Sequence, residues 1–134
     1  MTRSKTELQM LDQVELLNAG KPLAAFDAYF AEDGVMFAND QLFARGAAAA
    51  RQKQEPFINA ARSIAGEITD FQSLPAKEQC VFHNRTRFTD AQGNAHQIDG
   101  LCWQQWRGGK IIEERYYDGT LMQTRISEGI LAPR

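Results

Sequence analysis

The sequence has little cysteine, little proline and no long hydrophobic segment. Its 134 residues include two cysteines and four prolines. Polar residues interrupt the apolar ones too often to give the run of about 20 residues that spans a membrane. The start of the chain, Met1 to Lys5, leads into a patterned helix rather than into the apolar stretch of a signal peptide. We therefore expect a cytoplasmic protein without a membrane partner.

An excess of charge of one sign is also missing, because 15 Lys and Arg residues face 17 Asp and Glu residues. The basic residues are scattered, so the sequence predicts no positively charged patch for nucleic acid. No pair of His, Cys or carboxylate residues has metal-site spacing, and no glycine-rich loop has a nucleotide-binding pattern. These absences predict a site that works without a metal or another cofactor.

The first half of the sequence has mainly helical spacing. Ser4-Lys5-Thr6-Glu7 is a capping box, in which Ser4 accepts from the amide of Glu7. Proline at position 56 removes an amide donor, so we expect a break or kink in the helix that contains it. Three helices are predicted: one that buries Leu8, Leu11, Val14 or Glu15, and Leu17 and stops at Asn18-Ala19-Gly20; one from Pro22 until Glu32-Asp33-Gly34; and one from Ala47 to about Ile64.

The second half has mainly the spacing of strands and tight turns. Two short strands, Val35 to Asn39 and Leu42 to Arg45, already separate the second and third helices. The later strands are Glu67 to Leu74, Gln79 to Thr89, Ala95 to Trp106 and Ile111 to Asp118, and Leu121 to Arg134 is a short cover or a frayed end. The order predicts one α+β domain over residues 1–134, with helices covering one face of a curved antiparallel or mixed sheet.

The lengths of two hairpin loops predict which side chains share a face of this sheet. A two-residue loop at Gln92-Gly93 places Arg85 opposite Gly100, and a three-residue loop at Arg107-Gly108-Gly109 places Cys102 opposite Glu114. One face then carries His83, Arg85, Arg87, Cys102, Glu114, Tyr116 and Asp118. The other carries Phe82, Asn84, Phe88, Asp99, Leu101, Trp103, Glu113 and Tyr117.

This register has two consequences. Cys80 and Cys102 fall on opposite faces and cannot pair, so both are expected to be reduced thiols in the core. The ionisable face either lines a polar pocket, where an acid, a base and a cation converge, or is solvated while the face with Phe82, Leu101 and Trp103 packs against the helices. Periodicity alone leaves both alternatives open.

Three segments resemble the nuclear transport factor 2-like superfamily, and specifically its SnoaL-like polyketide cyclase branch. They are Phe26 to Val35, Phe43 to Gly46 and Gly109 to Asp118, and the resemblance covers about Leu11 to Gly119. It implies a cone-shaped α+β barrel, open at one end, whose strongly curved sheet encloses a pocket. It also implies a homodimer through the outer face of the sheet. Members include cyclases, isomerases, epoxide hydrolases and dehydratases, and proteins that only bind or scaffold.

The same resemblance directs attention to Asp118, since related enzymes place an acid/base carboxylate where the last strand ends. His83 is an alternative proton carrier. Arg85 and Tyr116 are predicted to steady an enolate oxygen. The epoxide hydrolases have an Asp where this chain has Arg87, so epoxide hydrolysis is disfavoured. The residues predicted to contact substrate are Phe26, Tyr29, Arg87, Cys102, Trp103 and Glu114.

The resulting hypothesis is a small cofactor-independent enzyme that transfers a proton during cyclisation, isomerisation or dehydration of a hydrophobic, carbonyl-containing molecule. The alternative is a non-catalytic small-molecule-binding or dimerisation module of the same fold. A third possibility is an accessory domain that binds protein through an exposed apolar patch. A mechanism through Arg85 and Asp118 fails if both side chains lie outside the cavity.

Overall fold

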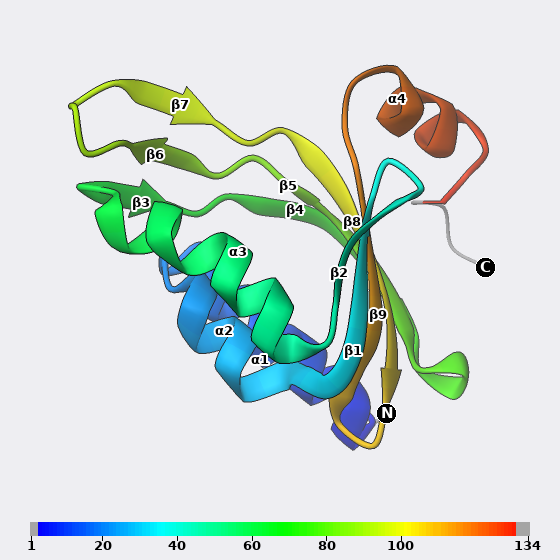
Figure 1. The fold of residues 1–134 in the computed structure, drawn as a ribbon. Coiled ribbons are helices and arrows are strands. Elements are labelled where there is room, and N and C mark those ends of the chain that lie inside the picture. Colours follow the sequence, from blue (N-terminus) through cyan, green and yellow to red (C-terminus); the bar gives the residue numbers. More distant parts are fainter. Residues whose placement is uncertain (1–2, 131–134) are drawn as a thin grey trace.

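The computed structural model describes residues 3–130, which form a curved sheet with three helices on one side and a fourth helix at the other (Figure 1). The helices are α1 (Lys5–Asn18), α2 (Pro22–Tyr29), α3 (Ala47–Ala60) and α4 (Gly119–Ser127), with a 3-10 turn at Pro75–Lys77. The strands are β1 (Phe30–Ala38), β2 (Gln41–Arg45), β3 (Ser63–Ala65), β4 (Ile68–Leu74), β5 (Gln79–Asn84), β6 (Arg87–Thr89), β7 (Ala95–Gln97), β8 (Gly100–Arg107) and β9 (Lys110–Tyr117).

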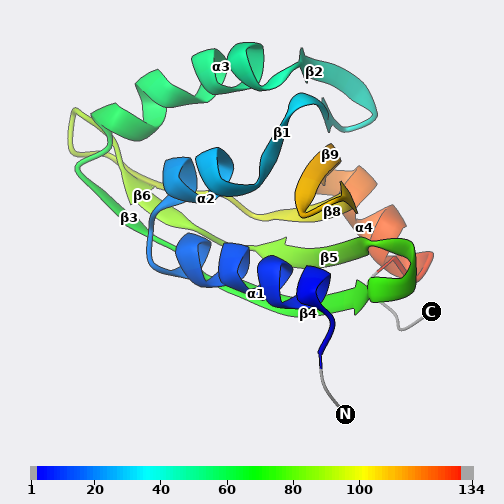
Figure 2. The same ribbon diagram turned by 90° about the horizontal axis from the view of Figure 1, so that it is seen from below.

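The strands form a large mixed sheet and a small antiparallel one. The large sheet has the order β2-β1-β9-β8-β5-β4, in which β1 and β9 run parallel, and the small sheet has the order β3-β6-β7. Seen from below, α1 lies along β4 and β5 while α3 lies on the far side of α2 (Figure 2). This arrangement confirms the predicted α+β fold with helices on a curved sheet. Among the described strands, β2 and β4 remain separate edges, so the cone is not a closed barrel.

Each face of the large sheet has its own apolar core. On the concave face, helices α1 to α3 cover a cluster of Met10, Phe30, Met36, Ala44, Ala50, Cys80, Trp106 and Ile111. On the outer face, α4 places Met122 against Val81, Leu101 and Tyr117. The predicted C-terminal cover is therefore a helix, α4, that packs on the outer face of the sheet. The part of this prediction that concerns 131–134 lies outside the described residues.

Most helix boundaries agree with the sequence, and the differences have local causes. Ser4 Oγ accepts from the amide of Glu7 at 3.1 Å, as the capping box predicts. The second helix ends at Tyr29, earlier than predicted, because Phe30 already pairs with Ile111 of β9. The third helix continues through Pro56, so the predicted break does not occur there, and it ends at Ala60 instead of near Ile64 because Ser63–Ala65 pairs with β6.

The predicted register of the first hairpin is wrong by one residue. Gly93 donates its amide to Asp90 O at 3.0 Å, and Asp90 donates to Asn94 O at 2.9 Å, so the loop holds three residues instead of two. Gly93 takes the left-handed position, with a φ of 86°, that follows a type I turn in such loops. Asn84 therefore pairs with Gly100, and Phe82 with Cys102. This single-residue slip moves His83 to the outer face and Phe82 and Asn84 to the concave face.

The second hairpin is displaced by two residues, which preserves the faces. Gly108 and Gly109 form a two-residue loop with φ values of 58° and 81°, as a type I′ turn requires. A bulge between Gln105 and Trp106 then pairs Gln104 with Glu114 and Cys102 with Tyr116. Cys102, Glu114 and Tyr116 therefore share one face, as predicted.

Candidate active site

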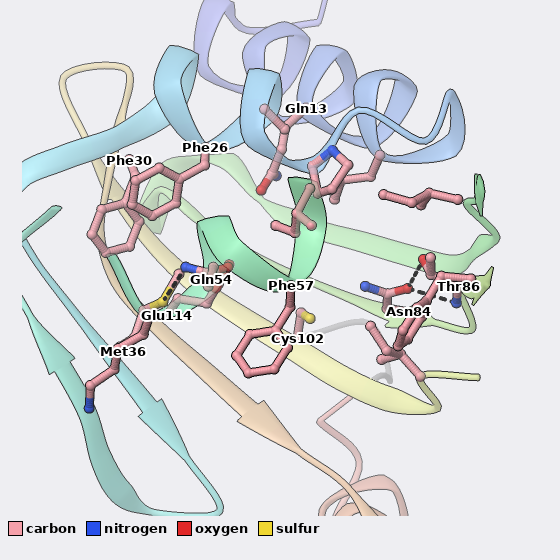
Figure 3. A pocket seen from close by; sticks show the side chains of 18 of the residues that line it. Gln13, Phe26, Phe30, Met36, Gln54, Phe57, Asn84, Thr86, Cys102 and Glu114 are labelled. Atoms are coloured by element: carbon pink, nitrogen blue, oxygen red, sulfur yellow. Dashed lines mark hydrogen bonds between the residues drawn. The ribbon is translucent and has the colours of Figure 1, made fainter. Parts of the chain in front are cut away.

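A cavity of about 440 Å³ lies between the concave face of the large sheet and the helices (Figure 3). Its wall is mostly apolar, with aromatic and aliphatic side chains from helices α1, α2 and α3 and from strands β1, β2, β3, β5, β6 and β9. The wall comprises Gln13, Leu17, Pro22, Ala25, Phe26, Phe30, Met36, Phe43, Lys53, Gln54, Phe57, Ile58, Ala61, Ile64, Phe82, Asn84, Thr86, Phe88, Ile98, Cys102, Ile111 and Glu114. Such a space suits an apolar small molecule that is oriented by a few polar groups.

Glu114 is the carboxylic acid in this wall. Strand β9 lies between β1 and β8, and its pairing with Met36 on one side and Gln104 on the other turns Glu114 toward the concave face. The surrounding protein removes water from the carboxyl group, and this burial raises the pKa of Glu114 above its usual value of 4.5. The hydrogen bond from Gln104 acts in the opposite direction and partly offsets the increase in pKa.

The donor to Glu114 is itself held in a buried network. Gln104 is fully buried, and its Nε2 donates to Glu114 Oε1 at 2.6 Å and to Gln13 Oε1 at 2.7 Å. Gln104 Oε1 accepts from Gln13 Nε2, from the indole of Trp106 at 3.0 Å and from the thiol of Cys80. The indole N–H of Trp106 can only donate, so the atom that it contacts must be the amide oxygen. Gln104 therefore presents its NH₂ group to Glu114.

The second carboxyl oxygen of Glu114 has no hydrogen-bond partner among the described residues, yet it is not a buried orphan. Within residues 3–130, the one buried side-chain oxygen or nitrogen without a partner is Gln72 Oε1. Glu114 also retains some accessible surface while lining the cavity. One oxygen is thus fixed by Gln104, and the other is open to a molecule in the cavity.

The two cysteines are buried thiols on the same concave face, not on opposite faces as predicted. Cys80 pairs with Gln104 and Cys102 with Phe82 in adjacent strands, and both sulfurs are free. Burial raises the pKa of each thiol, and the nearby Glu114 raises both further. They are therefore protonated near neutral pH, and a protonated thiol is a poor nucleophile.

A separate polar pair, Asn84 and Thr86, lines the cavity where β5 gives way to β6. Asn84 Oδ1 accepts from the backbone amide of Thr86 at 3.0 Å and from the Thr86 hydroxyl. In Figure 3 the oxygen of the Asn84 amide faces Thr86 and the nitrogen points the other way, toward the centre of the cavity. The pair therefore presents N–H donors to the cavity.

One side of the cavity is formed by the second half of α3. Phe57 lines the cavity and is 77% exposed, so it lies where the cavity meets solvent. Gln54 Nε2 donates to Ala50 O and to Met36 Sδ, the latter at 3.6 Å (Figure 3). Sulfur is a weak acceptor, so this second bond is easily exchanged for one to a ligand oxygen.

The predicted catalytic residues lie outside the cavity wall. Asp118 is exposed, and its Oδ1 accepts from Asn39 Nδ2 at 2.9 Å. Arg85 lies in the connection between β5 and β6, where its backbone amide donates to Glu67 O. His83 is on the outer face, with Nε2 at 2.5 Å from Asp99 Oδ1. Because Arg85 and Asp118 are both absent from the wall, the mechanism through this pair is not retained.

Tyr116 is on the concave face beyond Cys102 but is also absent from the wall. Its ring packs over Gly100, where a Cβ atom would come within 2.2 Å of the ring. Burial raises the pKa of the Tyr116 hydroxyl, with Cys102, Asp118 and Asp99 adding to the increase. Tyr116 therefore packs against the concave face of the sheet next to the cavity without lining it.

Of the six residues predicted to contact substrate, three line the cavity and three do not. Phe26, Cys102 and Glu114 line the cavity. The hydroxyl of Tyr29 donates to Asp12 and its ring packs on Trp106, while Arg87 is exposed beside Glu67 and Trp103 packs on the outer face. Sequence analysis missed the amides, namely Gln13, Gln54 and Gln104, as site residues, and it placed Asn84 on the other face. The Asp90-Ala91-Gln92-Gly93-Asn94 turn could have corrected the placement of Asn84.

Other site chemistries find little support in the described part of the chain. No cluster of three or more His, Cys, Asp or Glu side chains there has the arrangement of a metal site. The helices described in residues 3–130 are all too short or too polar to cross a membrane. The polar side chains of the cavity wall are the carboxyl group of Glu114, the amides of Gln13, Gln54 and Asn84, the ammonium group of Lys53, the hydroxyl of Thr86 and the thiol of Cys102.

Comparison with known proteins finds likeness in structure. No protein-family model matches the chain, and no curated protein matches its sequence. A proposed SnoaL-like polyketide cyclase from Mesorhizobium loti is 22% identical, with a TM-score of 0.66 over 87% of this chain and 100% of its own. AclR, a proposed hydroxylase from Streptomyces galilaeus, is 12% identical with a TM-score of 0.69, over 95% and 98% of the two chains.

A third structure, TerC crystallised with polyporic acid, is 12% identical with a TM-score of 0.63, over 94% of this chain and 100% of its own. Two further structural matches are described as NTF2-like proteins of unknown function. At these identities the likeness establishes the fold. The chain therefore has the fold of the SnoaL-like proteins within the nuclear transport factor 2-like superfamily.

Proposed function

We propose that the chain is a cofactor-independent enzyme that transfers a proton to or from carbon in an apolar, carbonyl-containing small molecule, with Glu114 as the proton-transfer group. The observation that carries this proposal is a single carboxylic acid, fixed by Gln104, in the wall of a mostly apolar cavity. A general base works best when its pKa lies near the working pH, and burial raises the pKa of Glu114 in that direction.

The proposed reaction begins with ionised Glu114 taking a proton from the carbon next to a substrate carbonyl. The electron pair of that C–H bond moves to the carbonyl oxygen and forms an enolate. The acid form of Glu114 then returns the proton to another carbon, which isomerises the substrate, or to a leaving hydroxyl group, which dehydrates it. Attack of the enolate carbon on a second carbonyl of the same molecule closes a ring instead, and the acid form of Glu114 then gives its proton to the resulting alkoxide oxygen.

Two amides support these steps. Gln104 holds one carboxyl oxygen, so that the other points at the substrate. Gln54 lies beside Met36, the cross-strand neighbour of Glu114, and its bond to Met36 Sδ can be exchanged for one to the enolate oxygen. A donor placed where negative charge develops lowers the barrier to reaction. This assignment gives to Glu114 and Gln54 the roles that sequence analysis gave to Asp118 and Arg85.

The comparisons supply general support. Proteins of this fold include a proposed polyketide cyclase and a protein crystallised with polyporic acid. The fold thus accommodates small organic molecules in at least one relative. The class of substrate proposed for this chain depends on its own cavity, which combines an apolar wall with few polar groups.

The experiment is hydrogen–deuterium exchange at the α-carbons of a panel of cyclic and aryl ketones in D₂O, followed by NMR. The matched variants are Glu114→Gln and Glu113→Gln, because Glu113 is the adjacent residue and pairs with Arg115 away from the wall. We expect Glu114→Gln to slow exchange by roughly 100-fold or more. Glu113→Gln should retain the parent rate.

Equal exchange rates for the parent and Glu114→Gln would refute the proposed role of this carboxyl group. Binding of the ketones without enhanced exchange in the parent would instead support the alternative, a small-molecule-binding module. The two outcomes are distinguished by measuring binding and exchange on the same samples.

The predicted homodimer through the sheet stays a prediction. On the outer face, α4 covers the cluster around Leu101 and Tyr117, so a dimer of this kind must use the part of the face that α4 leaves open. Sedimentation equilibrium measures whether the dimer forms.

A further inference from the structure

The polar groups of the cavity lie at two separate places on the sheet. Asn84 of β5 pairs with Gly100 of β8, whereas Glu114 of β9 pairs with Gln104, which is four residues further along β8. Because β8 lies between β5 and β9, the two residues are also two strand spacings apart across the sheet. At about 3.3 Å per residue and about 4.8 Å per strand, their Cα atoms are offset by roughly 13 Å along the strands and roughly 10 Å across them. Asn84 is therefore too far from Glu114 to act on the same substrate atom.

From this arrangement we propose that Asn84 is an anchor for a neutral acceptor oxygen at the far end of the substrate. The substrate is then an elongated apolar molecule with one reactive carbonyl group near Glu114 and a second oxygen, of a carbonyl or hydroxyl group, near Asn84. The inference rests on the proposed function for the reactive end and adds the class of molecule that fits the whole cavity.

The orientation of the Asn84 amide carries the argument. A backbone N–H group can only donate, and the amide of Thr86 donates to Asn84 Oδ1 at 3.0 Å. The other terminal atom must therefore be the NH₂ group, which donates only. The Thr86 hydroxyl also bonds Oδ1 and reinforces this orientation.

The NH₂ group is open to a ligand. Asn84 lines the cavity, and its nitrogen has no hydrogen-bond partner among the described residues, although it is not one of their buried unpaired atoms. Figure 3 shows the nitrogen directed toward the cavity and away from Thr86. Its neighbours in the wall, Phe82, Phe88 and Ile98, are apolar and provide no competing acceptor side chain.

Charge selects between the possible acceptors. The wall contains two ionisable residues, Glu114 and Lys53. Glu114 lies at the other end of the cavity, and the ammonium group of Lys53 donates to Phe43 O. A carboxylate at Asn84 would thus lose its water without gaining a cation, which is costly. A neutral oxygen loses less and gains one hydrogen bond.

The experiment compares two probes of one skeleton, 4-phenylcyclohexanone and phenylcyclohexane, which differ by a terminal oxygen. Their dissociation constants are measured by NMR titration of ¹⁵N-labelled protein in a background that carries Glu114→Leu and Gln54→Leu. These changes remove the proposed proton transfer and the side-chain donor for a carbonyl at the other end of the cavity. Asn84→Asp is the diagnostic variant, because it keeps an oxygen for Thr86 and replaces the NH₂ donor by an acceptor. Asn94→Asp is the control, because it makes the same chemical change at an exposed residue outside the wall.

We expect the ketone to bind roughly three- to tenfold more tightly than the hydrocarbon, which is the range for one neutral hydrogen bond. Asn84→Asp should abolish this preference while leaving the dissociation constant of the hydrocarbon unchanged, and Asn94→Asp should keep it. The side-chain ¹⁵N signal of Asn84, identified by its loss in Asn84→Asp, should shift with the ketone alone.

The proposal is overturned if the preference survives in Asn84→Asp, if the parent has no preference, or if neither probe binds. Unchanged binding of the hydrocarbon to Asn84→Asp shows that the variant is folded. Failure of the proposed function is seen separately, as deuterium exchange that does not depend on Glu114. Either result can therefore stand without the other.

Discussion

Glu113 and Glu114 are adjacent residues of one strand, yet they have different environments. Glu114 faces the cavity, where burial raises its pKa and an uncharged amide is its partner. Glu113 is partly exposed and accepts from Arg115 Nε at 2.7 Å, and that guanidinium lies 4.2 Å from the centre of the Phe37 ring. The comparison shows that the face of the strand, and not the type of residue, gives a carboxyl group its chemistry.

The glutamines that oppose these residues repeat the contrast. Gln104 opposes Glu114 and is fully buried, with four partners in the core. Gln105 opposes Glu113, and its Nε2 donates to backbone oxygens, including Lys77 O at 2.8 Å. The amide of Gln104 holds Glu114 in the candidate site, whereas the amide of Gln105 is bonded to the 3-10 turn after β4. Substitutions on the two faces can therefore be compared in pairs.

The largest effect on stability is expected from Gln104→Leu. Leucine leaves buried polar groups of Gln13 and Trp106 without their partner, and each such group costs about 1–3 kcal/mol. We expect the free energy of unfolding to fall by about 3 kcal/mol, measured by urea denaturation. Gln105→Leu should cost about 1 kcal/mol, because its partners, backbone oxygens and the side chain of Gln79, lie nearer to solvent. Equal losses for the two variants would contradict the contrast between the faces.

An intermediate effect is expected from pH. The folded-state pKa of Glu114 is raised, so the native protein favours the protonated carboxyl group more than the unfolded chain does. The stability that the parent gains from this group is fully present below the unfolded pKa of about 4.5. It is lost as the pH rises through the folded-state pKa.

Urea denaturation of the parent and of Glu114→Gln across this pH range measures the effect. The difference in free energy of unfolding, parent minus variant, should decrease with rising pH and then level off. Each unit of difference between the two pKa values corresponds to about 1.4 kcal/mol. A difference that increases with pH would mean that the folded state favours the ionised form of Glu114.

The sequence was sufficient for the order of the longer helices and strands, and it placed Glu114 on the correct face but Asn84 on the wrong one. Glu114 was assigned to the correct face because the error in the second hairpin was two residues, which leaves every side chain on its side. Asn84 was assigned to the wrong face because the error in the first hairpin was one residue. The difference came from the loop at Ala91-Gln92-Gly93, where Asp90 accepts from the amides of Gln92 and Asn94.

The buried amides were beyond sequence reasoning for another reason. The predicted apolar side of α1 included Leu8, which is 54% exposed, whereas Met10 and Gln13 are buried. Gln13 is buried because its partner, Gln104, comes from a strand 91 residues away. Hydrophobic periodicity ranks a glutamine as a surface residue, and only the tertiary pairing of two amides reverses that ranking.

The smallest effect is expected from Glu113→Gln, the outer-face counterpart of the active-site substitution. The pair with Arg115 is about one-third exposed on each side, and such surface pairs contribute about 0.2–1 kcal/mol. We expect a loss in this range in urea at low salt, and its near disappearance in 1 M NaCl, where the screening length falls to about 3 Å. Glu114→Gln has no cation to lose in the cavity wall near it, so its effect on stability should depend on pH and hardly on salt. If both variants responded to salt alike, the carboxyl group of Glu114 would be in contact with bulk solvent, and the difference between the two faces of β9 would not hold.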